Sequence, residues 1–367
     1  MKYRLLLVLS TFLIFGCETN DGDDTNDGFD RTAMLTNWAD NLIIPAYNHY
    51  YDELTKLDEA KDAFVTDQSE VNLQTLRTSW KEAYKAWQWV GMYQIGQSES
   101  IYLLGFTNTF PADAAQIENL IASGEYNFEL PTRMSQQGFP ALDYLINGLG
   151  ADDAAILAVY QGDSGASYVQ YLSDVVDRLL NLTSQVVDNW NQGYRETFIA
   201  NSGSSKSSAV DKLVNDYISY FEGHIRKAKI GDPAGVFTGV KDPNTVEGFY
   251  QSDIAKSLFL ESLKASKAFF NGEYFDQTGS GESLFSYLKY LNTIKETEAL
   301  EELINEQFDL AEQKSSALSD NFSEQVVLDN TLMLETYQEL QRNVVFMKVD
   351  MLSAMSIAVD YMDNDGD

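Results

Sequence analysis

The chain has 367 residues, with 56 acidic and 25 basic side chains and a formal net charge of −31. Such an acidic surface repels nucleic acid and anionic headgroups, which excludes a nucleic-acid-binding function and favours cations or basic partners. The single cysteine, Cys17, excludes intramolecular disulfides and metal sites built from several thiolates. Only two histidines are present, so a multi-histidine metal site is excluded as well.

The N-terminal segment is typical of a lipoprotein signal. Lys2 and Arg4 precede an apolar stretch from Leu5 to Phe15, and Gly16-Cys17 follows. The stretch has 11 residues, whereas a membrane-spanning helix needs roughly 20, so residues 1–16 are predicted to be a cleaved signal peptide. A small residue directly before a cysteine is typical of lipoprotein processing, which acylates that cysteine. We therefore expect a protein of the cell envelope, held at the periplasmic or surface face of the outer membrane by a lipid on Cys17.

The rest of the chain divides by composition into a tether and two helical halves. Residues 18–28 carry no apolar side chain, and residues 17–28 are predicted to be a lipidated, flexible tether. The serine-rich segment 201–208 is the most linker-like interior stretch. It separates an N-terminal helical bundle, 29–200, from a C-terminal helical bundle, 209–367.

Apolar residues recur at helical spacing along both halves, which predicts an all-α fold with negligible sheet. The clearest stripes fall in four segments: 73–90, 169–190, 213–225 and 334–355. Pro45 lies inside the first helical segment, where a kink or break is expected because proline lacks the amide hydrogen.

Two irregular segments, 103–112 and 231–248, are rich in glycine, proline, asparagine and aromatic residues, yet too apolar for a disordered tail. Such loops often fold over a site, although plain interhelical packing explains them equally well. The chain has no zinc-peptidase His-Glu-x-x-His, no Gly-x-Ser-x-Gly elbow and no phosphate-binding loop.

One segment resembles a known signature. The sequence Gly138-Phe-Pro-Ala-Leu-Asp143-Tyr-Leu-Ile-Asn-Gly148 is similar to the signature region of the imelysin family, whose motif is Gly-x-His-x-x-Glu. Further segments resemble family stretches in the same order along the chain, namely 80–96, 108–113, 116–118, 224–235 and the acidic ending 363–367. The resemblance implies two helical bundles packed side by side, with the site between them, in an envelope protein associated with iron uptake.

The resemblance can be carried over only in part. Gly138 matches the motif, but Pro140 stands at the histidine position and Asp143 at the glutamate position. Proline has no donor atom for a metal, so the ligating pair is broken. The bland interpretation is that Pro140 begins a helix and that Asp143 complements its dipole. The functional one is that Asp143 lines a ligand cleft and, as the single candidate ligand, contacts iron or another divalent metal.

A second group of candidates lies in the C-terminal half. His224 and Arg226 could form a cationic pocket for an anionic or chelated ligand, with Glu247 and Tyr250 as neighbours. They could equally be structural residues that pair with carboxylates between the halves. Together with Gly138 and Asp143, these residues make up the predicted ligand-binding set.

Three functions follow from these patterns. The preferred one is a non-catalytic binding lipoprotein for iron or another metal complex, with a transport protein of the outer membrane as a partner. The second is a metallopeptidase, as some members of the resembled family are classed. The third is a nutrient- or glycan-binding lipoprotein, which requires Trp87, Trp89 and Tyr93 to be exposed together in a groove.

Overall fold

The computed structural model describes residues 27–295 and 297–361. The signal peptide, Cys17, most of the tether and the acidic ending lie outside these residues. Asp27, at the edge of the predicted tether, already belongs to the folded body, because its carboxylate binds the Arg31 guanidinium through two hydrogen bonds of 3.0 and 2.9 Å.

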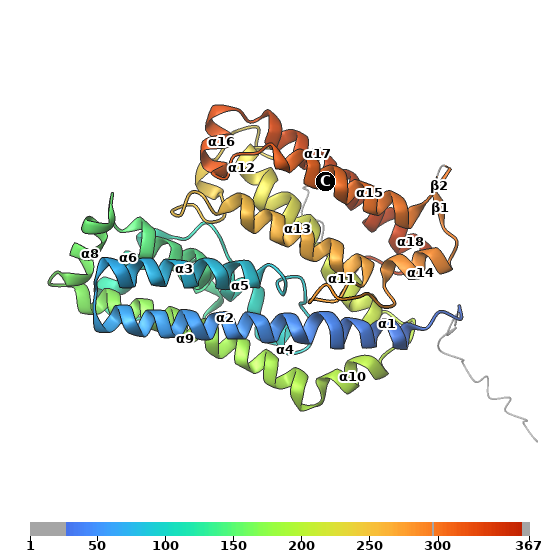
Figure 1. Ribbon diagram of the computed structural model, residues 1–367, viewed down its shortest axis with the longest axis horizontal. Coiled ribbons are helices and arrows are strands. Elements are labelled where there is room, and N and C mark those ends of the chain that lie inside the picture. Colours follow the sequence, from blue (N-terminus) through green and yellow to red (C-terminus); the bar gives the residue numbers. More distant parts are fainter. Residues whose placement is uncertain (1–26, 296, 362–367) are drawn as a thin grey trace, which may run out of the picture.

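The N-terminal half is built from helices joined by short turns (Figure 1). Its elements are α1 (Arg31–Asn37), η1 (Trp38–Ile43), α2 (Ile44–Thr66), α3 (Glu70–Trp87), α4 (Gln97–Ser100), α5 (Leu103–Thr107), α6 (Ala114–Ser123), η2 (Pro131–Gln136), α7 (Gly138–Asp143), η3 (Tyr144–Gly148), α8 (Asp153–Gln161), α9 (Gly165–Asn189), η4 (Trp190–Tyr194) and α10 (Arg195–Ala200). α2 packs along α3 and α9, and this trio forms the body of the half.

The C-terminal half is also helical. Its elements are α11 (Ala209–Tyr220), η5 (Phe221–Gly231), α12 (Asp232–Ala234), η6 (Pro243–Thr245), α13 (Ala255–Asn271), α14 (Leu284–Tyr290), β1 (Ile294–Lys295), β2 (Glu298–Ala299), α15 (Leu300–Ser316), α16 (Phe322–Leu328), α17 (Thr331–Val345), η7 (Phe346–Met351) and α18 (Leu352–Ala354). β1 and β2 form one small antiparallel hairpin, so the all-α prediction is confirmed.

The two halves lie side by side, with α13 between the N-terminal helices and the outer pair α15 and α17 (Figure 1). Trp38 and Phe269 meet across the junction with ring centroids 4.8 Å apart. The Asn37 amide donates to the Gly272 carbonyl at 3.0 Å. Buried residues of both halves form one continuous apolar cluster. The division at 201–208 stays a prediction.

Pro45 does not break the first helical rod. It lies in the first turn of α2, directly after the π-helical turn η1, and the helix runs on through both. The carbonyl of Asn41, four residues earlier, cannot receive a hydrogen from proline. It accepts the backbone N–H of Phe275 at 2.7 Å instead. The proline thus frees an acceptor that binds the C-terminal half.

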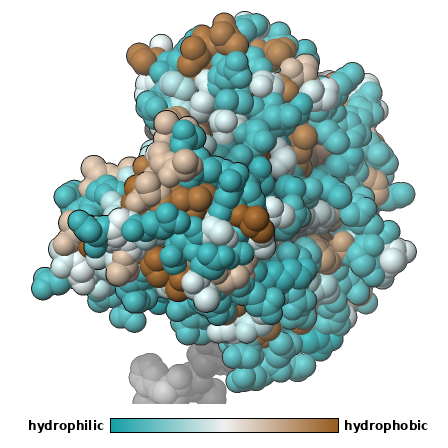
Figure 2. Space-filling model, turned by 60° about the vertical axis from the view of Figure 1, so that its left-hand side comes forward, coloured by the Kyte–Doolittle hydropathy of each residue, from teal (hydrophilic) through white to brown (hydrophobic). Residues whose placement is uncertain are grey.

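The face shown in Figure 2 is mostly hydrophilic, with apolar side chains in small groups. Figure 2 brings forward the end that carries α6 and α8. No helix within the described ranges is long and apolar enough to cross a bilayer.

Candidate functional site

The signature segment begins at a backbone crossing that only glycine fits. Gly138 has a φ of +75° and is buried where α7 starts against α5. A Cβ added there would lie 2.2 Å from the Thr107 carbonyl oxygen. The glycine of the signature therefore has a packing role, independent of any ligand.

Pro140 occupies the first turn of α7 and is buried. Its missing amide hydrogen leaves no helical bond unmade in that turn. The next layer is aromatic, because Phe139 stacks on Tyr84 with centroids 4.5 Å apart and its carbonyl accepts the Trp80 indole N–H at 3.2 Å. Pro140 therefore lies in the buried first turn of a helix that packs against aromatic side chains.

Asp143 ends α7 and joins the two halves of the molecule. One carboxylate oxygen accepts the backbone N–H of Gln251 and the Asn147 side-chain amide, both at 2.9 Å. The other accepts the backbone N–H of Tyr250 at 2.9 Å. Burial raises the pKa of Asp143 to about 7, and these three hydrogen bonds oppose the rise without cancelling it. Asp143 therefore titrates near neutral pH while it holds the 244–251 loop.

A pocket of about 240 Å³ opens beside Asp143. It is mostly aromatic and apolar, and the two irregular segments singled out in the sequence meet there. Its lining residues are Phe110, Pro111, Ala112, Pro140, Asp143, Asn244, Val246, Gly248, Phe249 and Tyr250. A second hollow of about 430 Å³ is also lined by Phe110 and Pro111, together with Asp232, Lys241 and Asp242. Both hollows lie between segments of the two halves.

Behind the pocket, a buried polar network crosses between the halves. The Lys229 ammonium forms an ion pair with Glu247 and donates to the side-chain amide oxygen Oε1 of Gln88 at 2.8 Å. The Asn108 amide donates to Glu247 at 2.7 Å and accepts the Tyr84 hydroxyl hydrogen at 2.6 Å. Burial lowers the pKa of Lys229. Each charge has a partner, which is the condition for keeping such groups inside a protein.

His224 and Arg226, two of the predicted ligand-binding residues, do not line the pocket beside Asp143. His224 is partly buried and stacks on Tyr220, with centroids 5.1 Å apart. Burial, aided by the Lys229 charge, lowers its pKa to about 4, so it is neutral at physiological pH. Arg226 is fully buried, with an ion pair to Glu222 at 3.4 Å and a hydrogen bond to Gln341. Of the predicted set, only Asp143 and Tyr250 line the pocket.

The aromatic groove required by the glycan-binding alternative is not formed. Trp87 and Tyr93 are buried in the core. Trp89 is partly buried, and its indole N–H donates to Glu261 at 3.0 Å. The three rings are therefore not exposed together.

The pocket does not fit a bare metal ion. Pro140 offers no donor atom, and the oxygens of Asp143 already accept three hydrogen bonds. Across residues 27–295 and 297–361, no three histidine, cysteine or carboxylate side chains are grouped so that they could hold a metal. The single candidate ligand, Asp143, instead binds the loop of the other half.

Sequence reasoning missed the residues that complete the network, Tyr84, Gln88, Asn108 and Lys229. All four fall in stretches that resemble the family, but their pairing gives no periodic signal. Glu247 was selected as a neighbour of His224, whereas its ion pair is with Lys229.

The helical fold, and the signature segment whose Asp143 binds the loop of the other half, define a protein of the imelysin type. The imelysin family model matches residues 43–345, so the chain belongs to the imelysin family. No curated protein matches it in sequence.

Two solved structures share the fold. A putative iron-regulated protein A precursor from Parabacteroides distasonis has a TM-score of 0.72 at 19% identity, covering 89% of this chain and 95% of its own. An imelysin-like protein from Psychrobacter arcticum has a TM-score of 0.68 at 16% identity, with coverage of 90% and 97%. At these identities the likeness establishes the fold alone.

Proposed function

We propose that this imelysin-family protein is a lipid-anchored binding protein of the cell envelope that takes up iron, or another metal, as a complex, without catalysis. The observation that carries the proposal is the chemistry of the motif. Pro140 cannot ligate, and Asp143 accepts hydrogen bonds from the opposite loop, so the pocket suits the organic shell of a chelate better than a naked ion. One structural neighbour is named as iron-regulated, which supports the link to iron. Such a role requires a transport protein of the outer membrane as a partner.

The aromatic lining supports binding through ring faces. Phe110, Phe249 and Tyr250 border the same pocket, and each ring offers a large apolar surface at little cost in side-chain entropy. Tyr250 also packs on Tyr144, with centroids 5.2 Å apart, which fixes one wall of the pocket. We infer that this wall contributes more affinity than any single charge.

Titration calorimetry tests the proposal with ferrous ion and ferric citrate as probes, on protein beginning at residue 18. We expect ferric citrate to bind and bare ferrous ion not to bind. Tyr250→Ala should weaken ferric citrate at least tenfold. Tyr102→Ala, on a side chain that is 64% exposed, is the matched control and should leave binding unchanged.

Other outcomes are equally informative. Tight binding of bare ferrous ion that is lost in Asp143→Ala would establish a metal site and overturn the chelate proposal. Binding of neither probe would remove the iron role. Release of fragments from an unfolded protein substrate would show that the protein is a peptidase.

A further inference from the structure

The point where the tether leaves the folded body is held firmly against α14. The Arg31 guanidinium, already bound to Asp27, also lies over the Tyr287 ring at 5.0 Å. Phe29 stacks on the same ring, with centroids 4.3 Å apart and an interplanar angle of 15°. The Tyr290 hydroxyl donates to the Asp27 carbonyl at 2.8 Å. The exit of the tether therefore has a fixed place beside α14.

This exit lies at one end of the molecule. Helices α1, η1 and α2 run without a break from Arg31 to Thr66, which at 1.5 Å per residue is about 54 Å. In Figure 1 the exit, α14 and the β1–β2 hairpin share one end, while α8, α6 and α16 lie toward the other. We call the first end, comprising residues 27–32, 202–206 and 287–295, the exit face.

The exit face differs in charge from the rest of this acidic protein. No Asp or Glu occurs from Ser283 to Lys295 or from Asn201 to Ser208. Residues 27–32 contribute two carboxylates to the face: Asp27, which is neutralised by Arg31, and Asp30, which is exposed. Lys295 pairs with Asp350 and lies opposite Glu298 in the hairpin. Lys206 and Lys289 are exposed, so the face lacks the excess negative charge of the whole chain.

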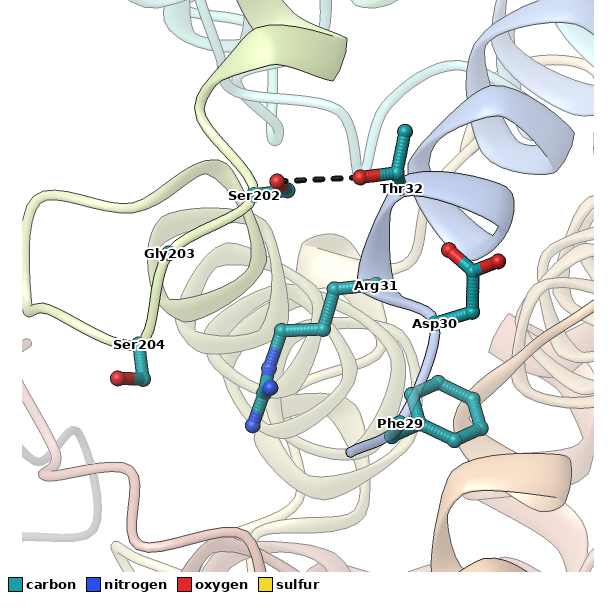
Figure 3. Close-up of a pocket in the computed structure, with 7 residues that line it drawn as sticks. All are labelled: Phe29, Asp30, Arg31, Thr32, Ser202, Gly203 and Ser204. Carbon is teal, nitrogen blue, oxygen red and sulfur yellow. Dashed lines mark hydrogen bonds between the residues drawn. The ribbon is translucent and has the colours of Figure 1, made fainter. Parts of the chain in front are cut away.

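The same face exposes amphipathic and apolar side chains. Tyr290 is 52% and Ile294 is 65% exposed. A polar hollow of about 430 Å³ lies between residues 29–32 and 202–204, and its lining residue Phe29 packs on Tyr290. Figure 3 shows the residues that line it, among which the Thr32 hydroxyl donates to Ser202 at 3.2 Å. Tyrosine with neighbouring lysine is the combination that suits the headgroup layer of a bilayer.

We propose that the exit face rests on the phospholipid headgroups of the membrane that holds the lipid anchor. The inference rests on the lipoprotein proposal. Asp27 is the tenth residue after Cys17, so the exit cannot be more than about 35 Å from the lipid. An inverted molecule, standing on its α8 end, would need about 54 Å. The pocket beside Asp143 is lined by Asn244 of η6, which contacts α16, so it is then presented away from the bilayer.

Lipid-borne quenching tests this orientation on the full mature, acylated protein in phosphatidylcholine–phosphatidylglycerol vesicles. Cys17 is the only natural cysteine, and acylation blocks its thiol, so Ile294→Cys accepts a thiol-reactive fluorophore at one position. Val327→Cys in α16 is the matched control, because Val327 is 62% exposed against 65% for Ile294. We expect a nitroxide on the lipid headgroup to quench the label at 294 at least twofold more than the label at 327.

Two results contradict the inference in distinguishable ways. Equal quenching at both positions, or stronger quenching at 327, in protein whose Cys17 carries the acyl mass would overturn the orientation alone. A Cys17 without acyl mass in envelope-purified protein would overturn the lipoprotein proposal, and the orientation with it.

Discussion

Gly138 carries the tightest backbone contact of the signature segment. Gly138→Ala should destabilise the protein by about 3 kcal/mol or more, since the methyl group meets a backbone oxygen and φ is positive. Gly124→Ala is the control, because Gly124 has a φ of +66° but nothing within 4 Å of its added Cβ. Gly124→Ala should lower the free energy of unfolding by only about 1 kcal/mol, the usual cost of a left-handed backbone conformation for alanine. Urea unfolding measures both, and equal losses would contradict the packing role of Gly138.

His224 provides a second test at the residue scale. Its folded pKa of about 4 lies below the ordinary 6.5, so the folded chain binds fewer protons than the unfolded one. Its contribution to stability is therefore present above pH 6.5 and is lost as pH falls toward 4. In an NMR titration, the imidazole chemical shifts of His224 should keep their neutral-form values until the pH falls to about 4. His49→Gln assigns the signal, and a midpoint near 6.5 would refute the buried, uncharged state.

At the scale of the elements, the network of Lys229 and Glu247 connects η5 and the following loop to α3. Lys229→Met should cost about 3–5 kcal/mol in unfolding free energy, because it leaves Glu247 buried and unpaired. The double variant Lys229→Met, Glu247→Leu should recover part of that loss. Lys267→Met, which breaks an exposed pair with Asp309, should change stability by about 1 kcal/mol or less. Additive losses in the double variant would show that the two buried charges are not coupled.

The helices themselves could be predicted from periodicity. The stripe that ends at Val90 corresponds to α3, and the stripe from Val169 to Trp190 falls on α9 and the first residue of η4. The site could be predicted only in part. Asp143 was selected because it occupies a position of the family signature. The two irregular segments were selected from their composition. The partners of Glu247 could not be found, because residues far apart in sequence leave no trace in local spacing. The surroundings of Arg226 could not be predicted for the same reason, since its guanidinium binds Gln341 and lies over Tyr337, both in α17.

At the scale of the whole molecule, the continuous core predicts cooperative behaviour. Aromatic contacts such as Trp38 with Phe269, and the clamp of Arg31 on Tyr287, couple the halves. We expect a single calorimetric transition, with a van't Hoff enthalpy equal to the calorimetric enthalpy. Two resolved transitions would mean that the halves unfold separately and that the predicted boundary at 201–208 is a true domain boundary.

The crossing at Gly138 also affects how the family signature is interpreted. Any chain in which α7 starts against the Thr107 carbonyl needs glycine at this position, whether or not its histidine and glutamate positions are intact. A match at this glycine therefore reports the architecture, and it carries no information about the side chains at positions 140 and 143.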